Sequence, residues 1–242
     1  MAAGTDLPLE LLDGLDPYAE QDREAARIDD FLTTLPDDGW TAPTGCAGWD
    51  RRDLLAHLAS TEDYHHACLD DTLGVFLERG IASGAADLDG FNAWGIHQLD
   101  GWSTDALLEH WRTRNAETRQ RMRARDGATM TTMVPDYPVR LQAFHVAQEL
   151  ASHADDLGVP IPPDETADRL AWRARFSRFV LAELGKEVTV EPAAPPGSGY
   201  RVTAGSEQAV VSGEELVAAA AGRLPAMSAL PDALRAALST MP

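Results

Sequence analysis

Two residues on one stretch of the chain have the types and the spacing of a metal-ligand pair. Glu149 and His153 are four positions apart, and residues at i and i+4 of an α-helix lie on one face about one turn apart. A third candidate ligand, His57, stands on a separate apolar stretch. Two imidazole nitrogens and one carboxylate oxygen would leave a position open for water or substrate, which is the ligand number of a catalytic metal site.

Spacing alone leaves the choice of histidine open. His145 lies four residues before Glu149 on the same expected helix face and could replace His153 as its partner. All three residues cannot bind one ion, because positions 145 and 153 are separated by about 12 Å along a helix axis. The sequence therefore predicts a metal site made of His57, Glu149 and one of these two histidines.

Helices must position these side chains. Four stretches are predicted to be helical from their apolar spacing and end signals: residues 17–35, the residues after a cap at Asp50, residues 103–126, and a stretch ending at Gly158. Between the second and third, residues 80–102 hold five glycines, and we predict a connection there with a short helix near residues 91–99. Four long helices and one extended connection predict an antiparallel four-helix bundle for residues 1–160.

The pattern changes after a proline-rich segment at residues 159–163. One more amphipathic helix is expected over residues 165–184, and short β-branched runs follow between residues 187 and 212. Ser212 and Glu215 form a capping-box pattern at the start of an alanine-rich helix, and a last short helix begins near Pro231. The predicted fold is thus mainly α, with a small α+β module over residues 161–242.

Composition excludes several classes of function. The chain has 20 Lys and Arg against 39 Asp and Glu, a net charge of -19, and therefore lacks the basic surface that nucleic-acid binding needs. No apolar run approaches the roughly 20 residues of a membrane span, and the first ten residues do not resemble a signal peptide. We expect a cytoplasmic protein with no nucleic-acid or membrane partner. A single lysine and abundant alanine and glycine are typical of a high-GC genome, such as an actinobacterial one.

The two cysteines do not form a recognisable motif. Cys46 and Cys68 are too few for a disulfide framework and lack the spacing of a zinc ribbon or a redox pair. We expect both to be buried or incidental, with Cys46 in the loop before the helix of His57.

Three segments resemble a known family. Residues 40–58, WTAPTGCAGWDRRDLLAHL, and residues 149–157, ELASHADDL, are similar to the motifs of the mycothiol-dependent maleylpyruvate isomerase family of the DinB-like superfamily. Residues 210–224, VVSGEELVAAAAGRL, look like the end of the small sterol-carrier-like module that follows the bundle in many members. The resemblance thus covers most of the chain.

The resemblance implies a specific site and chemistry. It assigns His57, Glu149 and His153 as ligands of a divalent metal, usually zinc, and leaves His145 outside the motif. Asp156 takes the place of the motif's final aspartate, where it could orient a ligand or bind the polar arms of a thiol. Mycothiol would be the cosubstrate, its metal-bound thiolate being transferred or added to a small electrophilic substrate, by S-transfer or by cis-trans isomerisation of the maleylpyruvate type. Residues 81–140 should line much of the pocket, but they carry nothing that specifies a substrate.

Two other functions fit the same residues. The first is a thiol-independent DinB-like metalloenzyme, such as a hydrolase or a tailoring enzyme of secondary metabolism, and activity without any thiol would favour it. The second is a binding or stress-response protein that keeps the metal for stability only. The complete ligand set argues against this last hypothesis.

Overall fold

The computed structural model describes residues 7–195 and 197–240, which form two compact units. The first unit runs from Asp16 to Pro160. The second contains the described residues before Asp16 and those from Ile161 onward.

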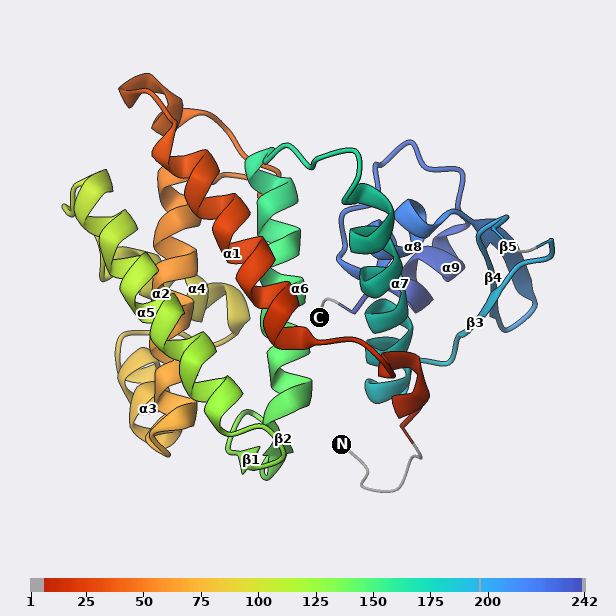
Figure 1. Cartoon of the computed structure of the whole chain (residues 1–242), viewed down its shortest axis with the longest axis horizontal. Helices are drawn as coiled ribbons and strands as arrows, with labels where there is room; N and C mark the ends of the chain where they lie inside the picture. The colour runs from red at the N-terminus through yellow and green to blue at the C-terminus, as the bar shows by residue number, and fades with distance from the viewer. Residues whose placement is uncertain (1–6, 196, 241–242) are drawn as a thin grey trace. The chain divides into compact units, whose positions relative to one another are not determined.

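Four long helices build the first unit, as Figure 1 shows: α1 (Pro17–Thr33), α2 (Arg51–Leu69), α5 (Thr104–Ala124) and α6 (Val139–Leu157). Their ends carry the expected signals. Asp50 forms a capping box with Asp53, Ser103 caps α5, and α6 ends at Gly158 in the left-handed conformation. The predicted four-helix bundle is confirmed.

Side-chain contacts fix the directions of these helices. Arg52 donates to the carbonyls of Leu99 and Trp102 beside the start of α5, and Arg121 near the end of α5 pairs with Asp70 just after α2. The helices α2 and α5 therefore run parallel. Both are antiparallel to α1 and α6, as the colours in Figure 1 also show.

The connection between α2 and α5 is more helical than predicted. It contains α3 (Leu73–Ala82) and α4 (Leu88–His97), where only one short helix near residues 91–99 is predicted. Glycine weakens the helical signal, but here it permits close packing, because a Cβ atom at Gly80 would lie 2.2 Å from the ring of Phe91.

Short elements complete this unit. A 3-10 helix, η2 (Asp37–Thr41), precedes α2, and two short antiparallel strands, β1 (Thr129–Met130) and β2 (Tyr137–Pro138), precede α6. Apolar side chains from all four long helices form one core, with Ile28, Leu54, Trp111 and Val139 among its buried members. This core holds α2 against α6, the two helices that carry the predicted site.

The second unit combines helices with a small sheet. It contains η1 (Leu9–Leu12), α7 (Thr166–Glu183), β3 (Thr189–Pro192), β4 (Tyr200–Ala204), β5 (Glu207–Val211), α8 (Gly213–Ala220) and α9 (Asp232–Leu238). The sheet is antiparallel in the order β3-β4-β5, and Val202, Val211 and Leu216 lie in its core. Ser212 and Glu215 form the expected capping box at the start of α8. The mainly helical fold with a small α+β part is confirmed.

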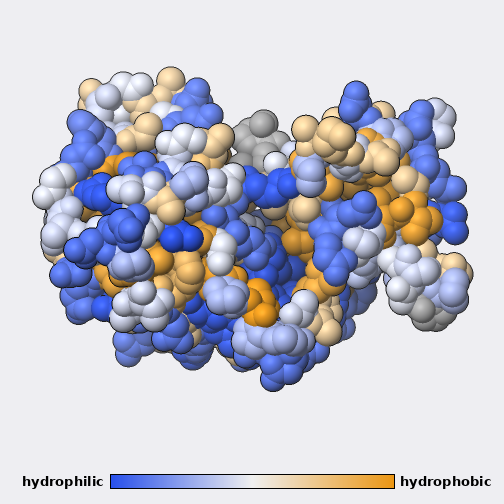
Figure 2. Space-filling view, turned by 90° about the horizontal axis from the view of Figure 1, so that it is seen from above, coloured by the Kyte–Doolittle hydropathy of each residue, from blue (hydrophilic) through white to orange (hydrophobic). Residues whose placement is uncertain are grey.

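The surface is hydrophilic over much of its area. Hydrophilic residues cover much of the face seen in Figure 2, and apolar residues lie in smaller groups among them. Among the described residues, no helix is both long enough and apolar enough to cross a bilayer.

Candidate metal centre

Three candidate ligands come together where α2 faces α6. One ligand atom each from His57, Glu149 and His153 lies within 4.8 Å of the other two. Nε2 of His57 is 3.7 Å from Oε1 of Glu149, and the centres of the two imidazole rings are 4.9 Å apart. Two ligands about 2.1 Å from a tetrahedral ion are about 3.4 Å apart, so these side chains are spaced to hold one.

Asp156 fixes the orientation of one histidine. Its Oδ2 lies 3.0 Å from Nδ1 of His153, one turn earlier on α6, and both residues are largely buried. A carboxylate accepts the Nδ1 proton, which leaves the lone pair on Nε2 of His153. A hydrogen bond of this kind from a carboxylate is typical of histidines that bind metals.

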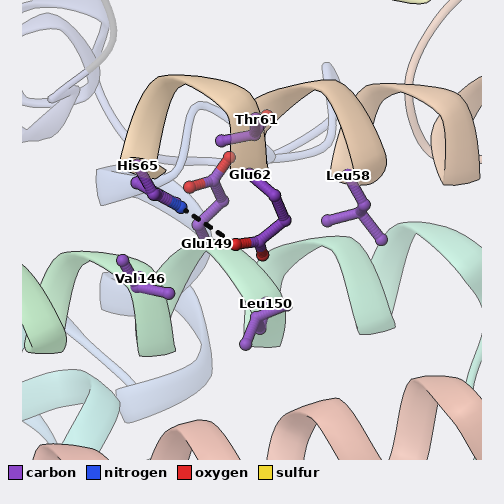
Figure 3. A pocket seen from close by; sticks show the side chains of 7 residues that line it. All are labelled: Leu58, Thr61, Glu62, His65, Val146, Glu149 and Leu150. Carbon is purple, nitrogen blue, oxygen red and sulfur yellow. Dashed lines mark ion pairs between the residues drawn. The ribbon is translucent and has the colours of Figure 1, made fainter. Parts of the chain in front are cut away.

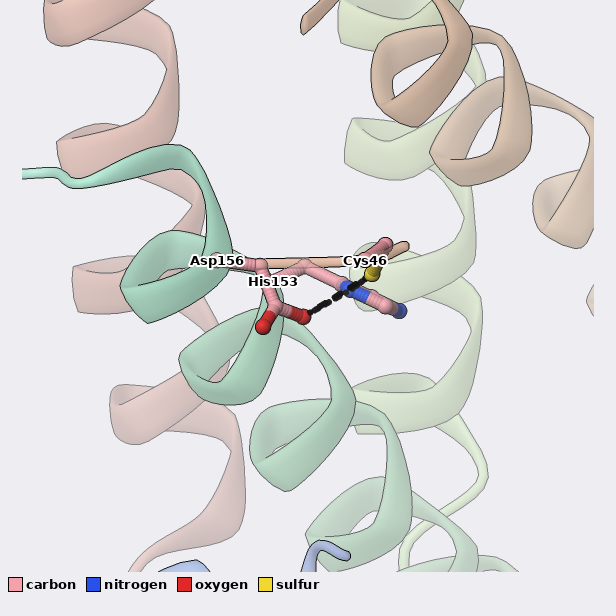
Figure 4. A group of neighbouring side chains, drawn as sticks. All are labelled: Cys46, His153 and Asp156. Carbon is pink, nitrogen blue, oxygen red and sulfur yellow. Dashed lines mark hydrogen bonds and ion pairs between the residues drawn. The ribbon is translucent and has the colours of Figure 1, made fainter. Parts of the chain in front are cut away.

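The loop before α2 holds Asp156 from the other side (Figure 4). The backbone N–H of Gly45 donates to the Asp156 carbonyl at 2.8 Å, and the thiol of Cys46 donates to Oδ2 at 3.2 Å. A Cβ atom at Gly45 would lie 2.5 Å from Oδ1 of Asp156, so glycine is required for this approach. Thr44 closes the loop by accepting the N–H of Cys46 and donating to the carbonyl of Trp49.

The segment of residues 40–58 thus supports the candidate ligands from outside the group. Its loop residues position Asp156, and the ring of Trp49 packs 5.0 Å from the ring of His57. Cys46 is partly buried and makes these polar contacts, whereas Cys68 is fully buried. Cys68 is thus buried as expected, whereas Cys46 is only partly buried and its thiol contacts Asp156.

The donor set fits a divalent metal. Two imidazoles and one carboxylate are ligands that zinc accepts in catalytic sites, and the set leaves a fourth position for another ligand. The Glu149 side chain keeps 29% of its surface accessible, so a small molecule can reach this side of the group. Cys46, His153 and Asp156 form a second group of three possible ligands, but their spacing is accounted for by the contacts to Asp156.

The structure shows which of His145 and His153 lies near the other two candidate ligands. His153 lies beside His57 and Glu149, whereas Nε2 of His145 lies 3.1 Å from the hydroxyl of Tyr137. Of the two alternatives, it is His153 that lies within reach of the candidate ligands.

A small pocket adjoins Glu149 between α2 and α6 (Figure 3). Its polar lining is Thr61, Glu62, His65 and Glu149, and its apolar lining is Leu58, Val146 and Leu150. All seven belong to α2 or α6, whereas residues 81–140 were expected to line much of the pocket. This small pocket lies directly between α2 and α6, and the expectation about residues 81–140 concerns the substrate pocket and stays a prediction.

The pocket also contains a buried pair of titratable residues, Glu62 and His65, to which the sequence pattern assigned no role. Glu62 and His65 are 2% and 3% exposed, and Nδ1 of His65 lies 3.6 Å from Oε2 of Glu62. Burial alone would raise the pKa of Glu62, but contacts from His65, Thr118 and Asn115 hold it below its usual value. Burial lowers the pKa of His65, yet the contact with Glu62 outweighs this and raises it.

The spacing of Glu62 and His65, three residues apart, is the one sequence signal for this pair. The neighbouring His66 makes an interhelical hydrogen bond, with Nε2 3.2 Å from the carbonyl of Arg114 on α5. Such pairs are common on helices, so spacing did not distinguish His65 from its neighbour.

Comparison with known proteins places these features in a family. No match was found among curated proteins. Two solved structures are similar over 92% of both chains: a mycothiol-dependent maleylpyruvate isomerase at 18% identity and a TM-score of 0.59, and a histidine-to-alanine mutant of such an enzyme at 17% and 0.56. At these identities the likeness shows the fold. The model of the mycothiol maleylpyruvate isomerase N-terminal domain matches residues 22–158, more than half of the chain, and the chain therefore belongs to that family.

Proposed function

We propose that this protein is a metal- and mycothiol-dependent enzyme that acts on a small electrophile, by S-transfer or by cis-trans isomerisation. The observation that carries the proposal is the meeting of His57, Glu149 and His153 on facing helices, with His153 oriented by Asp156. Family membership supports a thiol as the cosubstrate, and the accessible side chain of Glu149 gives small molecules a route to the site.

The chain's own residues have separable roles in this proposal. His57, Glu149 and His153 would hold a divalent ion, which we propose to be zinc, and such an ion lowers the pKa of a bound thiol so that the thiolate forms near neutral pH. Asp156 keeps Nδ1 of His153 protonated and its Nε2 directed to the site. The apolar packing of Trp49 against His57 restricts the second imidazole.

The remaining expectations form part of the same proposal. The partners would be a small-molecule substrate and a low-molecular-weight thiol. The protein would act in the cytoplasm. The net charge of -19 makes nucleic acid an unsuitable partner.

Calorimetric titration of mycothiol into the zinc-loaded protein tests the proposal. We expect binding to the wild type and to His145→Ala, a control on the same helix outside the ligand group. Binding should be lost in His57→Ala and His153→Ala, which should also lose zinc. Circular dichroism should show both variants folded, because the bundle core does not depend on these side chains.

Each alternative gives a different result. Zinc retention without thiol affinity would contradict the mycothiol proposal and favour thiol-independent chemistry. Unfolding of both histidine variants would instead indicate a metal that serves stability only.

A further inference from the structure

Cys46, His153 and Asp156 form a group of metal-binding atoms that includes a sulfur (Figure 4). Sγ of Cys46 lies 3.2 Å from Oδ2 of Asp156 and 3.9 Å from Nδ1 of His153, and Oδ2 lies 3.0 Å from Nδ1. Ligands of a tetrahedral ion, at about 2.0 to 2.3 Å from it, are about 3.3 to 3.6 Å apart. The three atoms can therefore hold an ion after shifts of a few tenths of an ångström.

The fold keeps these side chains in place. Hydrogen bonds to Asp156 account for their spacing, and the backbone N–H of Gly45 ties the loop to the carbonyl of Asp156. Thr44 accepts the backbone N–H of Cys46 at 3.1 Å. Because the fold has already ordered the three ligand atoms, an ion that binds them loses little of its binding free energy to ordering.

The sulfur distinguishes this group from the group of His57, Glu149 and His153. That first group offers nitrogen and oxygen atoms, whereas the second adds the thiolate of Cys46. Soft, polarisable cations prefer thiolate sulfur to oxygen. Cys46 is partly exposed, so an ion can reach it from solvent. The two groups should therefore select different cations.

His153 belongs to both groups. It offers Nε2 to the first group, whereas its Nδ1 faces Cys46 and Asp156 in the second. A neutral imidazole has one protonated and one unprotonated nitrogen. A ring that binds a cation through Nδ1 thus carries its proton on Nε2 and cannot bind a second cation there.

We infer that Cys46, His153 and Asp156 form a second metal site, selective for thiophilic cations, and that a cation bound there excludes the metal from the first site. On binding, the thiol of Cys46 releases its proton to solvent, and the ring proton of His153 is exchanged from Nδ1 to Nε2. The cation then bonds to Sγ, Nδ1 and Oδ2, and no oxidation state changes. The exclusion rests on the proposed function, because it takes the first group to hold a metal, whereas the second site does not.

Cadmium(II) is the probe for this site. It is added to the zinc-loaded protein up to an equimolar amount while the sulfur-to-cadmium charge-transfer absorption is followed. Elemental mass spectrometry after desalting then measures the zinc and cadmium that the protein retains. We expect the band to grow as zinc is lost, both in the wild type and in Cys68→Ala. Cys68→Ala is the matched control, because it removes the buried thiol outside the group.

Cys46→Ser should show no such band. Release of its zinc should require at least about tenfold more cadmium, because the cation then meets only nitrogen and oxygen ligands. A band that persists in Cys46→Ser, or no band in the wild type, would overturn the second site. A full band with all zinc retained would overturn the exclusion.

Further variants test the other ligands. Asp156→Asn and His153→Ala should weaken cadmium binding at the thiol by more than about tenfold, with circular dichroism showing that both are folded. Unchanged affinity would mean that Cys46 binds cadmium alone and would overturn the three-ligand site. His57→Ala alters the first group only and should keep the band. If His57→Ala does not fold, Glu149→Gln serves the same purpose.

The result is distinguishable from failure of the proposed function. A cadmium band that depends on Cys46, in a protein that does not bind mycothiol, would support the second site and contradict the thiol chemistry. Mycothiol binding to a zinc-loaded protein that gives no cadmium band would do the reverse.

Discussion

Nδ1 of His153 lies 3.0 Å from Oδ2 of Asp156, three residues further along α6. This contact connects the loop before α2 to the candidate metal centre, because the same carboxylate group also accepts from the thiol of Cys46. The loop thus acts on the site through Asp156, although none of its residues belongs to the group of His57, Glu149 and His153.

The first prediction concerns Asp156 itself. Replacing it with Asn removes the charge that orients His153, and we expect zinc affinity to fall about 10- to 100-fold, as is typical when such a partner of a ligand is lost. Competition with a chromophoric chelator measures this affinity. Asp155→Asn, on the exposed side of the same helix, is the control. Equal affinities in the two variants would remove the positioning role of Asp156.

The second prediction concerns the glycine that contacts Asp156. In Gly45→Ala the new Cβ atom would lie 2.5 Å from Oδ1 of Asp156, so the carboxylate must move. We expect a loss of zinc affinity comparable to that of Asp156→Asn, measured in the same competition assay. Gly74→Ala places a methyl group in open space and should leave the affinity unchanged. A normal affinity in Gly45→Ala would show that the loop does not control the site.

The third prediction concerns pH and the Glu62–His65 pair. The lowered pKa of Glu62 stabilises the fold above its unfolded value of about 4.3, and this contribution is lost as pH falls. The raised pKa of His65 stabilises the fold below about 6.5, and this contribution is lost as pH rises. Both stabilising contributions are present between about pH 4.3 and 6.5.

Denaturant unfolding of the metal-free protein measures this effect. The free energy of unfolding of the wild type should exceed that of the Glu62→Gln/His65→Gln double variant most between about pH 4.3 and 6.5. The difference should shrink on both sides of that window. A difference that is constant with pH would mean that the two groups do not form a charged pair in the fold.

The fourth prediction separates the two cysteines. Burial raises the pKa of the fully buried Cys68 thiol to about 11, so roughly a thousandth of it is thiolate at pH 8. Cys46 is partly buried. Alkylation of the native protein with iodoacetamide, followed by peptide mass spectrometry, should therefore modify Cys46 well before Cys68. Equal rates would contradict the burial of Cys68.

Most helices of the first unit, and part of the candidate site, could be predicted from the sequence. Caps at Asp50, Ser103 and Gly158 and the apolar spacing between them predicted the four long helices, because these signals are local. The helix α3 was missed because Gly80 weakens the local signal, while its contact with Phe91 becomes visible only in the folded chain.

The candidate site also has a part that local spacing predicts and a part that depends on contacts between distant residues. The spacing of Glu149 and His153 is local and was sufficient to propose a ligand pair, but the choice between His153 and His145 depends on which faces His57. The role of Glu62 depends on Asn115 and Thr118, more than fifty residues away on α5. Spacing within α2 could not indicate these donors.

Replacing zinc with cobalt(II) and following the absorption spectrum as mycothiol is added tests whether the ion held by His57, Glu149 and His153 binds the thiol. The experiment is done in the Cys46→Ser background, so that the protein's own nearby thiol cannot contribute. We expect a thiolate-to-cobalt charge-transfer band that saturates with mycothiol and is absent in Cys46→Ser/His57→Ala. Cobalt absorption bands that show the ion bound, with no charge-transfer band at any mycothiol concentration, would contradict the proposal that this site brings metal and thiol together.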